Sequence, residues 1–406
     1  MALIVSKFGG SSVASIERIR KVALRCKKMC AEGNSMVVVV SAMGDTTDEL
    51  IALARSASKR VPERELDMLL ATGEQQSAAL LAITLNGMGC KAVSLTGWQA
   101  GIRSDSTFFR AKIKKIETER IKTELDQGKI VVIAGFQGIT ADNDITTLGR
   151  GGSDTTAVAL AAALEAEKCI IFTDVAGVFT ADPRIVKEAR KLSQISYEEM
   201  LELATLGAAV LQPRAAELAM LYNVDVEVRS SFTFDPGTII TEVAKMENQR
   251  PVIGITHDLN CAKIALFDVP DRPGVAKLLF GELAKNKINV DMVIQSAMRD
   301  NRNDIAFTVE KNDIERVLPV VEDLVQKISA SGMSYGADVA KVSIVGAGMQ
   351  SNIGVVAAMF EALADEGINI QMISTSEIRV SCIIEDKMIE KAVMALHKKF
   401  ELDKAD

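Results

Sequence analysis

The chain has 406 residues, a formal net charge of −7 and a hydrophobic content of 48%. A chain of this length exceeds what one hydrophobic core holds, so we expect two or three domains. The acidic charge balance disfavours a nucleic-acid-binding protein. No apolar run approaches the ~20 residues of a membrane span, and the first residues do not resemble a signal peptide. We therefore expect a cytoplasmic protein with no membrane or nucleic-acid partner.

Cysteine and histidine offer little for metal or nucleophilic chemistry. Of the six cysteines, only Cys26 and Cys30 are close in sequence, and neither has a neighbouring zinc-site partner. The two histidines, His257 and His397, lie far from any serine, cysteine or metal-like cluster in the sequence. We expect free thiols and no metal site built from protein side chains.

Residues 1 to about 230 alternate short apolar runs with amphipathic stretches. Runs rich in β-branched residues predict buried strands at 2–8, 36–42, 91–95, 129–136, 168–175 and 224–231. Stretches between them predict helices that include 16–32, 63–86 and 154–166. This alternation is typical of an α/β fold, an open and mostly parallel sheet with helices on both faces. Ligands of such sheets bind at the carboxyl ends of the strands.

The first strand ends in Lys7-Phe8-Gly9-Gly10-Ser11-Ser12, directly before a predicted helix. Glycines at that junction let the backbone approach phosphate oxygens, and a lysine can follow charge onto a transferring phosphoryl group. A simple tight turn explains the glycine pair equally well. The chain has neither the GxxxxGK[ST] loop nor the protein-kinase catalytic loop, so phosphoryl transfer would need another scaffold.

Three further segments carry polar residues near strand ends. In the segment 146–156, Arg150 lies between glycines and can bind a carboxylate, while Ser153 and Asp154 suit a helix N-cap. In the segment 172–184, Asp174 follows a buried strand and Arg184 adds a cation. The third set combines residues 41–47 with Thr72-Gly73-Glu74, where a carboxylate and hydroxyls could bind an amino acid. A turn explains the second segment taken alone, and helix caps with a solvated glutamate explain the third. Helix caps explain Ser153 or Asp154 of the first segment, but not its glycines and its arginine.

The C-terminal part contains an internal repeat after a polar segment at 242–251. The blocks at 263–266, 274–276 and 288–292 resemble those at 341–344, 354–356 and 368–372 in the same order. Each copy predicts a βαββαβ unit of ferredoxin-like type.

The motifs KFGGSS, SAMGDTTDEL, TGEQQS, TGWQAGI, GFQG, TTLGRGGSDTTA and TDVAGVFTADPR occur in this order. Together with the repeat, they resemble the aspartate kinases of the amino acid kinase superfamily, which carry paired C-terminal ACT domains. The resemblance covers nearly the whole chain. It implies a catalytic domain at 1–245, a first ACT domain at 264–335 and a second ACT domain from 252–262 and 341–406.

The resemblance also implies roles for individual residues. Lys7 would stabilise the transferring phosphoryl group, and Asp154 would orient Lys7. Arg150 would bind the α-carboxylate of aspartate and Glu74 its ammonium group. The full set expected around aspartate is Ser41, Thr47, Glu74, Phe136, Arg150, Gly151, Gly152 and Ser153. The set expected around ATP with Mg²⁺ is Lys7, Phe8, Gly9, Gly10, Ser11, Thr173, Asp174, Phe179, Thr180, Asp182 and Arg184.

One position departs from the pattern of the resembled family, because Ala209 stands where a nucleotide-binding lysine is common. The loss of that cation makes a catalytically silent amino-acid sensor an alternative. Sister kinases that act on N-acetylglutamate, glutamate or UMP are a second alternative, and a substrate panel would separate them.

The ACT resemblance implies inhibition by lysine, threonine or both, and an assembly through the ACT domains. That assembly would be a homodimer, a homotetramer or an αβ form with a regulatory chain started at Met246. A purely structural dimerisation module is the alternative reading of the repeat. The expected effector positions are Asp271, Gly274, Val275, Ala276, Asn289, Asp291, Gln295, Asn352, Ile353, Gly354, Val355, Asn369 and Ile370.

Overall fold

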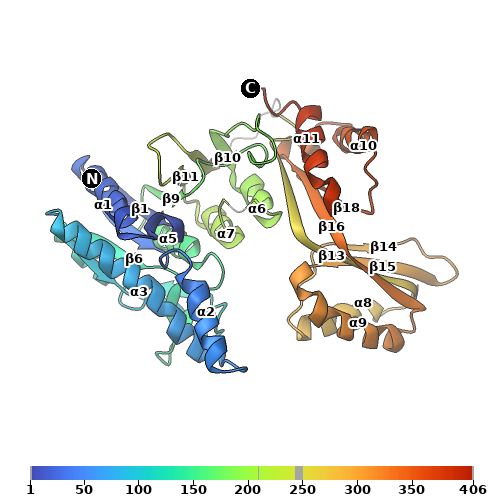
Figure 1. Cartoon of the computed structure of the whole chain (residues 1–406), viewed down its shortest axis with the longest axis horizontal. Coiled ribbons are helices and arrows are strands. Elements are labelled where there is room, and N and C mark those ends of the chain that lie inside the picture. The colour runs from blue at the N-terminus through green and yellow to red at the C-terminus, as the bar shows by residue number, and fades with distance from the viewer. Residues whose placement is uncertain (1, 209, 243–249, 405–406) are drawn as a thin grey trace. The chain divides into compact units, whose positions relative to one another are not determined.

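The computed structural model describes residues 2–208, 210–242 and 250–404 (Figure 1). The chain forms two compact units. The first unit comprises Met1–Val178, Lys191–Thr205 and Ala209–Ala244, and the second comprises Phe179–Arg190, Leu206–Ala208 and Lys245–Asp406. The positions of Ala209 and Met246 lie outside the described residues.

The first unit is built on an eight-stranded sheet in the order β10-β12-β11-β9-β1-β2-β6-β3. All neighbours in it are parallel except β11 and β12. Its strands are β1 Leu3–Phe8, β2 Ser35–Val40, β3 Ala92–Leu95, β6 Ile130–Ala134, β9 Lys168–Thr173, β10 Gln194–Ser196, β11 Val226–Ser230 and β12 Thr238–Thr241. The six strands predicted from apolar runs are thereby confirmed.

A smaller sheet in the order β5-β4-β7-β8 was not predicted. Its strands are β4 Ile102–Ser104, β5 Ile113–Ile116, β7 Gln137–Ile139 and β8 Ile145–Thr147. The helices of the first unit are η1 Gly10–Val13, α1 Ile16–Ala31, α2 Thr46–Ala57, α3 Glu63–Gly87, α4 Glu119–Asp126, α5 Gly152–Ala163, α6 Tyr197–Thr205 and α7 Pro213–Tyr222.

Helices cover both faces of the central sheet, as predicted. On one face α1 and α3 pack against Ile4, Phe8, Val38 and other alternate strand residues. Helix α1 begins at Ile16 because the Ser15 side chain caps the amide of Arg18. On the other face lies α5, which is rich in alanine and buried on nearly every residue, as expected for a helix that is apolar all round.

The second unit contains a six-stranded antiparallel sheet in the order β14-β15-β13-β16-β18-β17. Two long strands, β13 Gly254–Pro270 and β16 Gly332–Val345, run through both copies of the repeat. The start of β13 pairs with the end of β16, since Gly254 lies opposite Val345 and Asp258 opposite Lys341. The other strands are β14 Val293–Gln295, β15 Arg302–Val309, β17 Met372–Thr375 and β18 Arg379–Glu385.

Each copy of the repeat has its own core. Helices α8 Val275–Lys285 and α9 Ile314–Ile328 cover the first copy, and α10 Val355–Asp365 and α11 Ile389–Lys399 cover the second. Short helical turns lie at η2 Lys311–Asp313, η3 Ala347–Gln350 and η4 Asp386–Met388. The core of the second copy also takes in Ala181 and Val186. Residues 179–190 therefore fold with the second unit and not with the sheet that precedes them in sequence.

Candidate active site

The carboxyl ends of four parallel strands lie in one row. Phe8 at the end of β1 is in register with Phe172 of β9 and Val40 of β2, and Val40 is in register with Ala134 of β6. The row continues beyond the strands, because Gly9 N donates to Phe172 O at 3.2 Å, Ser41 N to Phe8 O at 3.1 Å, and Gly135 N to Val40 O at 3.0 Å. The segments singled out in the sequence after β1, β2, β6 and β9 therefore meet at one edge of the sheet.

A lysine–aspartate ion pair lies at this edge. Lys7 Nζ is 2.5 Å from Asp154 Oδ1, and the two side chains are 11% and 9% exposed. Lys7 alternates with Phe8 along β1 and therefore points to the face covered by α5, where Asp154 lies in the first turn. The Asp154 carboxylate fixes the position of the Lys7 ammonium group. This group lies beside the glycine loop, since a Cβ on Gly9 would be only 3.5 Å from Lys7 Nζ.

The glycine loop packs closely on the loop that follows β2. Gly44 N donates to Gly10 O at 3.1 Å. A Cβ on Gly10 would lie 3.0 Å from Ala42 O and 3.2 Å from Gly44 O, so a side chain there would push the two loops apart. This close approach explains the second glycine of the motif. It leaves backbone rather than side chain at the surface that the sequence assigns to phosphate.

A buried carboxyl group lies behind the second loop. Glu74 of α3 is 3% exposed, and its Oε1 accepts the Ala42 amide at 3.1 Å. Its Oε2 is buried without a hydrogen-bond partner among the described residues. Burial raises the pKa of Glu74 to about 8, against the opposing effect of the Ala42 amide. The side chain is a partly satisfied acceptor that a cationic group would complete.

The start of α5 meets the end of β6. Gly151 caps the helix with φ of 68°, and Phe136 also adopts a positive φ of 69°. The Ser153 hydroxyl oxygen would lie 2.8 Å from a Cβ on Gly135. Arg150 is exposed and lies directly before this turn. Asp154 lies in the same turn as Arg150's neighbours and binds Lys7. The two cations, Lys7 and Arg150, therefore lie at the same edge of the sheet.

Several residues that hold this edge together were missed in the sequence. Asp67 of α3 is fully buried and accepts the amides of Phe109 and Thr147 and the Thr147 hydroxyl. Arg214 of α7 donates to Leu148 O at 2.9 Å and to Ala111 O at 2.8 Å. These contacts fix the end of β8 and Leu148, directly before the turn that carries Arg150, to the segment at 109–111. No local pattern marks Asp67 or Arg214, because their partners are distant in sequence.

The expected nucleotide positions divide between the two units. Thr173 and Asp174 follow β9 in the first unit, beside Gly9, and the Thr173 hydroxyl donates to Asp174 Oδ1 at 3.0 Å. The Phe8 side chain is fully buried, so only its backbone is open to a ligand.

Phe179, Thr180, Asp182 and Arg184 lie in the second unit. Arg184 pairs with Asp182 at 2.7 Å, and this contact is the main cause that lowers the pKa of Asp182. Thr180 is fully buried, and its hydroxyl lies 3.0 Å from His397 Nε2 and accepts the Arg190 amide. Its side chain is therefore engaged inside the second unit, and its assignment to the nucleotide stays a prediction.

The expected effector positions cluster at equivalent loops of the repeat. Gly274 and Gly354 cap α8 and α10 with φ of 99° and 97°. Asp291 forms an ion pair with the buried Lys341 at 2.6 Å. Its repeat equivalent, Gln371, accepts from Lys263 at 3.3 Å. The positions exposed in the single chain are Asp271, Gly274, Ala276, Asn289, Asp291, Gln295, Asn352, Ile353, Gly354 and Asn369, whereas Val275 and Val355 are buried and Ile370 is half-buried.

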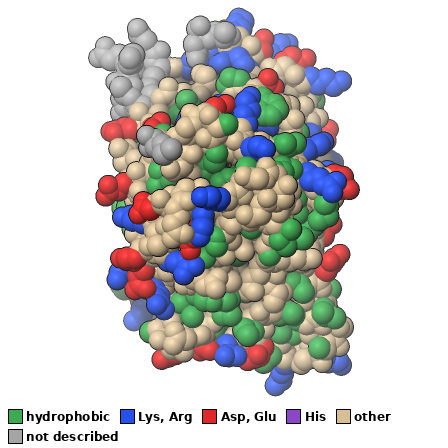
Figure 2. Space-filling view, turned by 90° about the vertical axis from the view of Figure 1, so that its left-hand side faces the viewer, with side chains coloured by type: hydrophobic (Ala, Val, Ile, Leu, Met, Phe, Trp, Pro, Cys, Tyr) green, Lys and Arg blue, Asp and Glu red, His purple; other side chains and the backbone are tan. Residues whose placement is uncertain are grey.

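One face of the molecule carries mixed charge. Basic and acidic side chains are interspersed on the face turned to the viewer in Figure 2. Across the described parts of the chain, no helix is both long and apolar enough to span a bilayer.

Family models match three regions of the chain. The amino acid kinase family matches residues 2–230, and ACT domains match residues 263–328 and 342–400. The aspartokinase of Bacillus sp. (strain MGA3) is 54% identical over 402 residues, which cover 99% of this chain and 98% of that protein. The aspartate kinase of Pseudomonas putida is 50% identical over 404 residues, with 99% and 98% covered.

A solved structure gives the same result. Escherichia coli aspartokinase III in complex with aspartate and ADP matches with a TM-score of 0.83 at 25% identity, over 98% of this chain and 99% of that one. The fold, the order of domains and the full-length relatives agree, and the chain therefore belongs to the aspartokinases, enzymes of the amino acid kinase family with two C-terminal ACT domains.

Proposed function

We propose that the enzyme transfers the γ-phosphoryl group of ATP to the β-carboxylate of L-aspartate and produces 4-phospho-L-aspartate and ADP. The observation that carries this proposal is Glu74, a buried carboxyl group with one unpartnered oxygen beside the loop after β2. A free amino acid supplies the ammonium group that this oxygen lacks, whereas an N-acetylated amino acid or a nucleotide acceptor does not.

The chemistry needs positioning and charge neutralisation rather than a general base. The β-carboxylate of aspartate is ionised at neutral pH, since its reference pKa is about 3.9. One carboxylate oxygen forms a bond to the γ-phosphorus while the bond from that phosphorus to the β,γ-bridging oxygen breaks, and ADP leaves with the electron pair. Lys7, held by Asp154 at 2.5 Å, neutralises charge on the transferring group. Mg²⁺ enters with ATP as part of the substrate.

The remaining roles at this edge follow the same logic. Arg150 binds the α-carboxylate of aspartate with its planar guanidinium group. The hydroxyls of Ser41, Thr47 and Ser153, the amides of Gly151 and Gly152, and the Phe136 ring complete the aspartate site. The backbone of Phe8, Gly9 and Gly10, together with Ser11, Thr173 and Asp174, binds ATP. Phe179, Asp182 and Arg184 are assigned to ATP on the resemblance alone, and Arg184→Ala with an unchanged KM for ATP would remove that assignment.

We further propose that lysine, threonine or both inhibit the enzyme through the ACT domains, as feedback on the first step toward lysine, threonine and methionine. The ACT domains would also hold a homo-oligomer or an αβ assembly together, in the cytoplasm.

The domain bounds proposed are 1–245 for the catalytic domain, 264–335 for the first ACT domain, and 252–262 with 341–406 for the second ACT domain. The two compact units do not meet at a single boundary in the sequence, because residues 179–190 and 206–208 belong to the second unit.

A coupled assay that measures ADP formation tests the proposal. The acceptors are L-aspartate, L-glutamate, N-acetyl-L-glutamate and UMP, each with ATP and Mg²⁺. We expect turnover with L-aspartate far above that with the others. Turnover with N-acetylglutamate or UMP but not with aspartate would contradict the proposal, and so would lysine or threonine binding without any ATP turnover.

A further inference from the structure

The loop that joins β11 to β12, residues 231–237, lies against the glycine loop and the end of β9. Ser231 N donates to Thr173 O at 2.8 Å. The Ser231 hydroxyl lies 2.5 Å from the hydroxyl of Ser12, a buried residue of η1 that is the second residue after the glycine pair. The 231–237 loop is thus hydrogen-bonded to both segments that the proposed function assigns to ATP, although no motif in it suggested a role.

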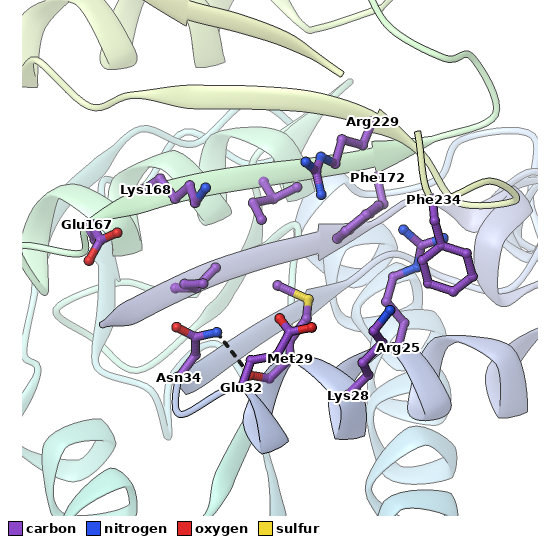
Figure 3. A pocket seen from close by; sticks show the side chains of 12 residues that line it. Arg25, Lys28, Met29, Glu32, Asn34, Glu167, Lys168, Phe172, Arg229 and Phe234 are labelled. Atoms are coloured by element: carbon purple, nitrogen blue, oxygen red, sulfur yellow. Dashed lines mark hydrogen bonds between the residues drawn. The ribbon is translucent and has the colours of Figure 1, made fainter. Parts of the chain in front are cut away.

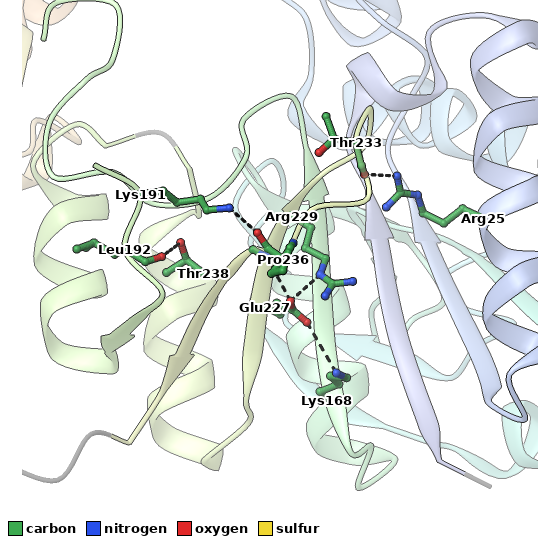
Figure 4. Close-up of polar contacts among 10 residues, drawn as sticks. Arg25, Lys168, Lys191, Leu192, Glu227, Arg229, Thr233, Pro236 and Thr238 are labelled. Atoms are coloured by element: carbon green, nitrogen blue, oxygen red, sulfur yellow. Dashed lines mark hydrogen bonds and ion pairs between the residues drawn. The ribbon is translucent and has the colours of Figure 1, made fainter. Parts of the chain in front are cut away.

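One arginine of α1 anchors this loop. The Arg25 guanidinium group donates to Thr233 O at 2.6 Å (Figure 4). It also donates to Ser231 O at 3.3 Å. Only 7% of Arg25 is exposed. At the far end of the loop, Lys191 donates to Pro236 O at 2.5 Å. The loop is therefore held at both ends by cations that bind its carbonyl oxygens.

The same guanidinium group lies between two aromatic rings. Its central carbon is 4.7 Å from the centre of the Phe172 ring and 4.4 Å from that of Phe234 (Figure 3). Phe172 in turn stacks on Phe8, with ring centres 4.6 Å apart and planes inclined by 5°. The Phe172 carbonyl also accepts the Gly9 amide. Arg25 therefore holds the Phe172 ring in place, and the Phe172 carbonyl oxygen is hydrogen-bonded to Gly9, the first glycine of the glycine loop.

Arg25 cannot itself touch the reacting groups. The side chains of Phe8 and Phe172 belong to the core on the α1 face of the sheet, whereas Lys7 points to the α5 face, where Asp154 binds it. Arg25 instead borders a hollow of about 330 Å³ on the α1 face that is also lined by Lys28, Lys168 and Arg229. Any influence of Arg25 on catalysis must pass through the backbone that it holds.

We propose that Arg25 is a positioning residue for phosphoryl transfer, which fixes Phe172 and Ser231 and through them the glycine loop next to Lys7. The proposal rests on the proposed function, because it assumes that ATP binds at Gly9–Ser11. Arginine suits the position for a physical reason. One nitrogen of its guanidinium group, Nη2, bonds both carbonyl oxygens while the same planar, weakly hydrated cation lies over two rings, and the compact, strongly hydrated ammonium group of lysine suits such ring contacts less well.

The test compares Arg25→Met and Arg25→Lys with Arg20→Met, an exposed arginine on the same helix. Ser12→Ala removes the Ser12–Ser231 bond from the opposite side and gives an independent variant if Arg25→Met folds poorly. Steady-state kinetics with ATP and aspartate and calorimetric ADP binding are measured well below each unfolding midpoint. A displacement of the glycine loop by about 1 Å can lower turnover roughly 100-fold.

We expect Arg25→Met to lower kcat about 10- to 100-fold, to raise the KM for ATP and the Kd for ADP, and to leave the KM for aspartate unchanged. Arg25→Lys should recover part of the loss. Ser12→Ala should likewise raise the KM for ATP and leave the KM for aspartate unchanged. Arg20→Met should match the wild type. A lowered unfolding midpoint with unchanged kcat and KM for ATP would overturn the proposal. If the wild type itself forms no phosphoaspartate, the proposed function fails instead.

Discussion

Lys7 Nζ and Asp154 Oδ1 lie 2.5 Å apart, although one residue belongs to the first strand and the other to a helix 147 positions later. The ion pair connects the glycine loop after β1 with the start of α5, which carries the segment around Arg150. It is the contact that converts two separate sequence motifs into one site.

Replacement of Lys7 tests the charge that this pair places beside the glycine loop. We expect Lys7→Met to lower kcat about 10²- to 10³-fold, the usual effect of removing one preorganised donor to a transition state. Since the substitution leaves Asp154 unpaired and almost buried, the double variant Lys7→Met with Asp154→Asn controls for lost stability. Lys21→Met, an exposed lysine on α1, is the matched surface control. Near-normal turnover in a folded Lys7→Met enzyme would contradict the mechanism.

The raised pKa of Glu74 predicts a pH dependence of aspartate binding. At pH 6 to 7 the carboxyl group is mostly protonated, because burial raises its pKa to about 8, and it must lose its proton to pair with an ammonium group. The KM for aspartate should therefore fall by up to about tenfold per pH unit as the pH rises toward 8. Glu74→Gln should raise this KM and make it independent of pH. A wild-type KM that stays flat between pH 6 and 8 would argue against the ammonium role.

The same group predicts a change in stability with the opposite sign from an ordinary carboxylate. Because the folded-state pKa of Glu74 lies above its ordinary value of 4.5, the stability that the protonated carboxyl group contributes is intact below pH 4.5 and is lost as the pH rises toward 8. Relative to the wild type, Glu74→Gln should gain stability across this window, with an unfolding midpoint higher by at least about 2 °C at pH 8. Thermal unfolding of both proteins at pH 5 and pH 8 measures the effect, and an equal difference at both values would contradict it.

Replacement of Arg150 should weaken the binding of aspartate and leave the binding of the nucleotide unchanged. Loss of a charge-assisted, two-pronged hydrogen bond is worth about 1.5–3 kcal/mol, so Arg150→Ala should raise the KM for aspartate roughly 10- to 100-fold. Arg150→Lys should recover only part, because an ammonium group cannot form both bonds in one plane. The Kd for ADP should not change in either variant. Arg55→Ala on the exposed side of α2 is the control, and a selective rise in the KM for ATP would refute the assignment.

Asp291 neutralises a buried lysine, Lys341, which is a structural role separate from its predicted role in effector binding. It pairs with Lys341, whose side chain is 5% exposed, while 34% of the Asp291 side chain is exposed. Asp291→Ala leaves a buried ammonium group unpaired and should destabilise the second unit by about 1–3 kcal/mol, less than for a fully buried pair. Asp323→Ala, which breaks a surface pair with Lys327, should cost under about 1 kcal/mol. Chemical denaturation measures both, and equal losses would contradict this role.

The central sheet could be predicted because its strands are continuous apolar runs such as Val37–Val40, buried on both faces. The sheet of β4, β5, β7 and β8 could not, because strands of three or four residues such as Ile102–Ser104 have too few positions to show a period. The same limit applies to β12, a strand of four residues that no apolar run marks.

The candidate site was predictable where chemistry and sequence coincide. Lys7, Gly9 and Arg150 stand out because glycines flank cations at strand or helix ends. Asp67 and Arg25 do not, because their partners lie 80 and 206 positions away and only the fold brings them together. The sequence was misleading for residues 179–190. Their motif predicts a part of the catalytic domain, whereas in the structure Ala181 and Val186 pack into the core of the second ACT copy.

Trapping of the reaction product tests the account most directly. An acyl phosphate reacts with hydroxylamine, so the wild type incubated with ATP, Mg²⁺, L-aspartate and hydroxylamine should yield aspartate β-hydroxamate, identified by mass spectrometry. Lys7→Met should yield about 10²- to 10³-fold less per unit time. Absence of the hydroxamate with the wild type, or its formation by Lys7→Met at the wild-type rate, would contradict the claim that Lys7 serves phosphoryl transfer to the β-carboxylate.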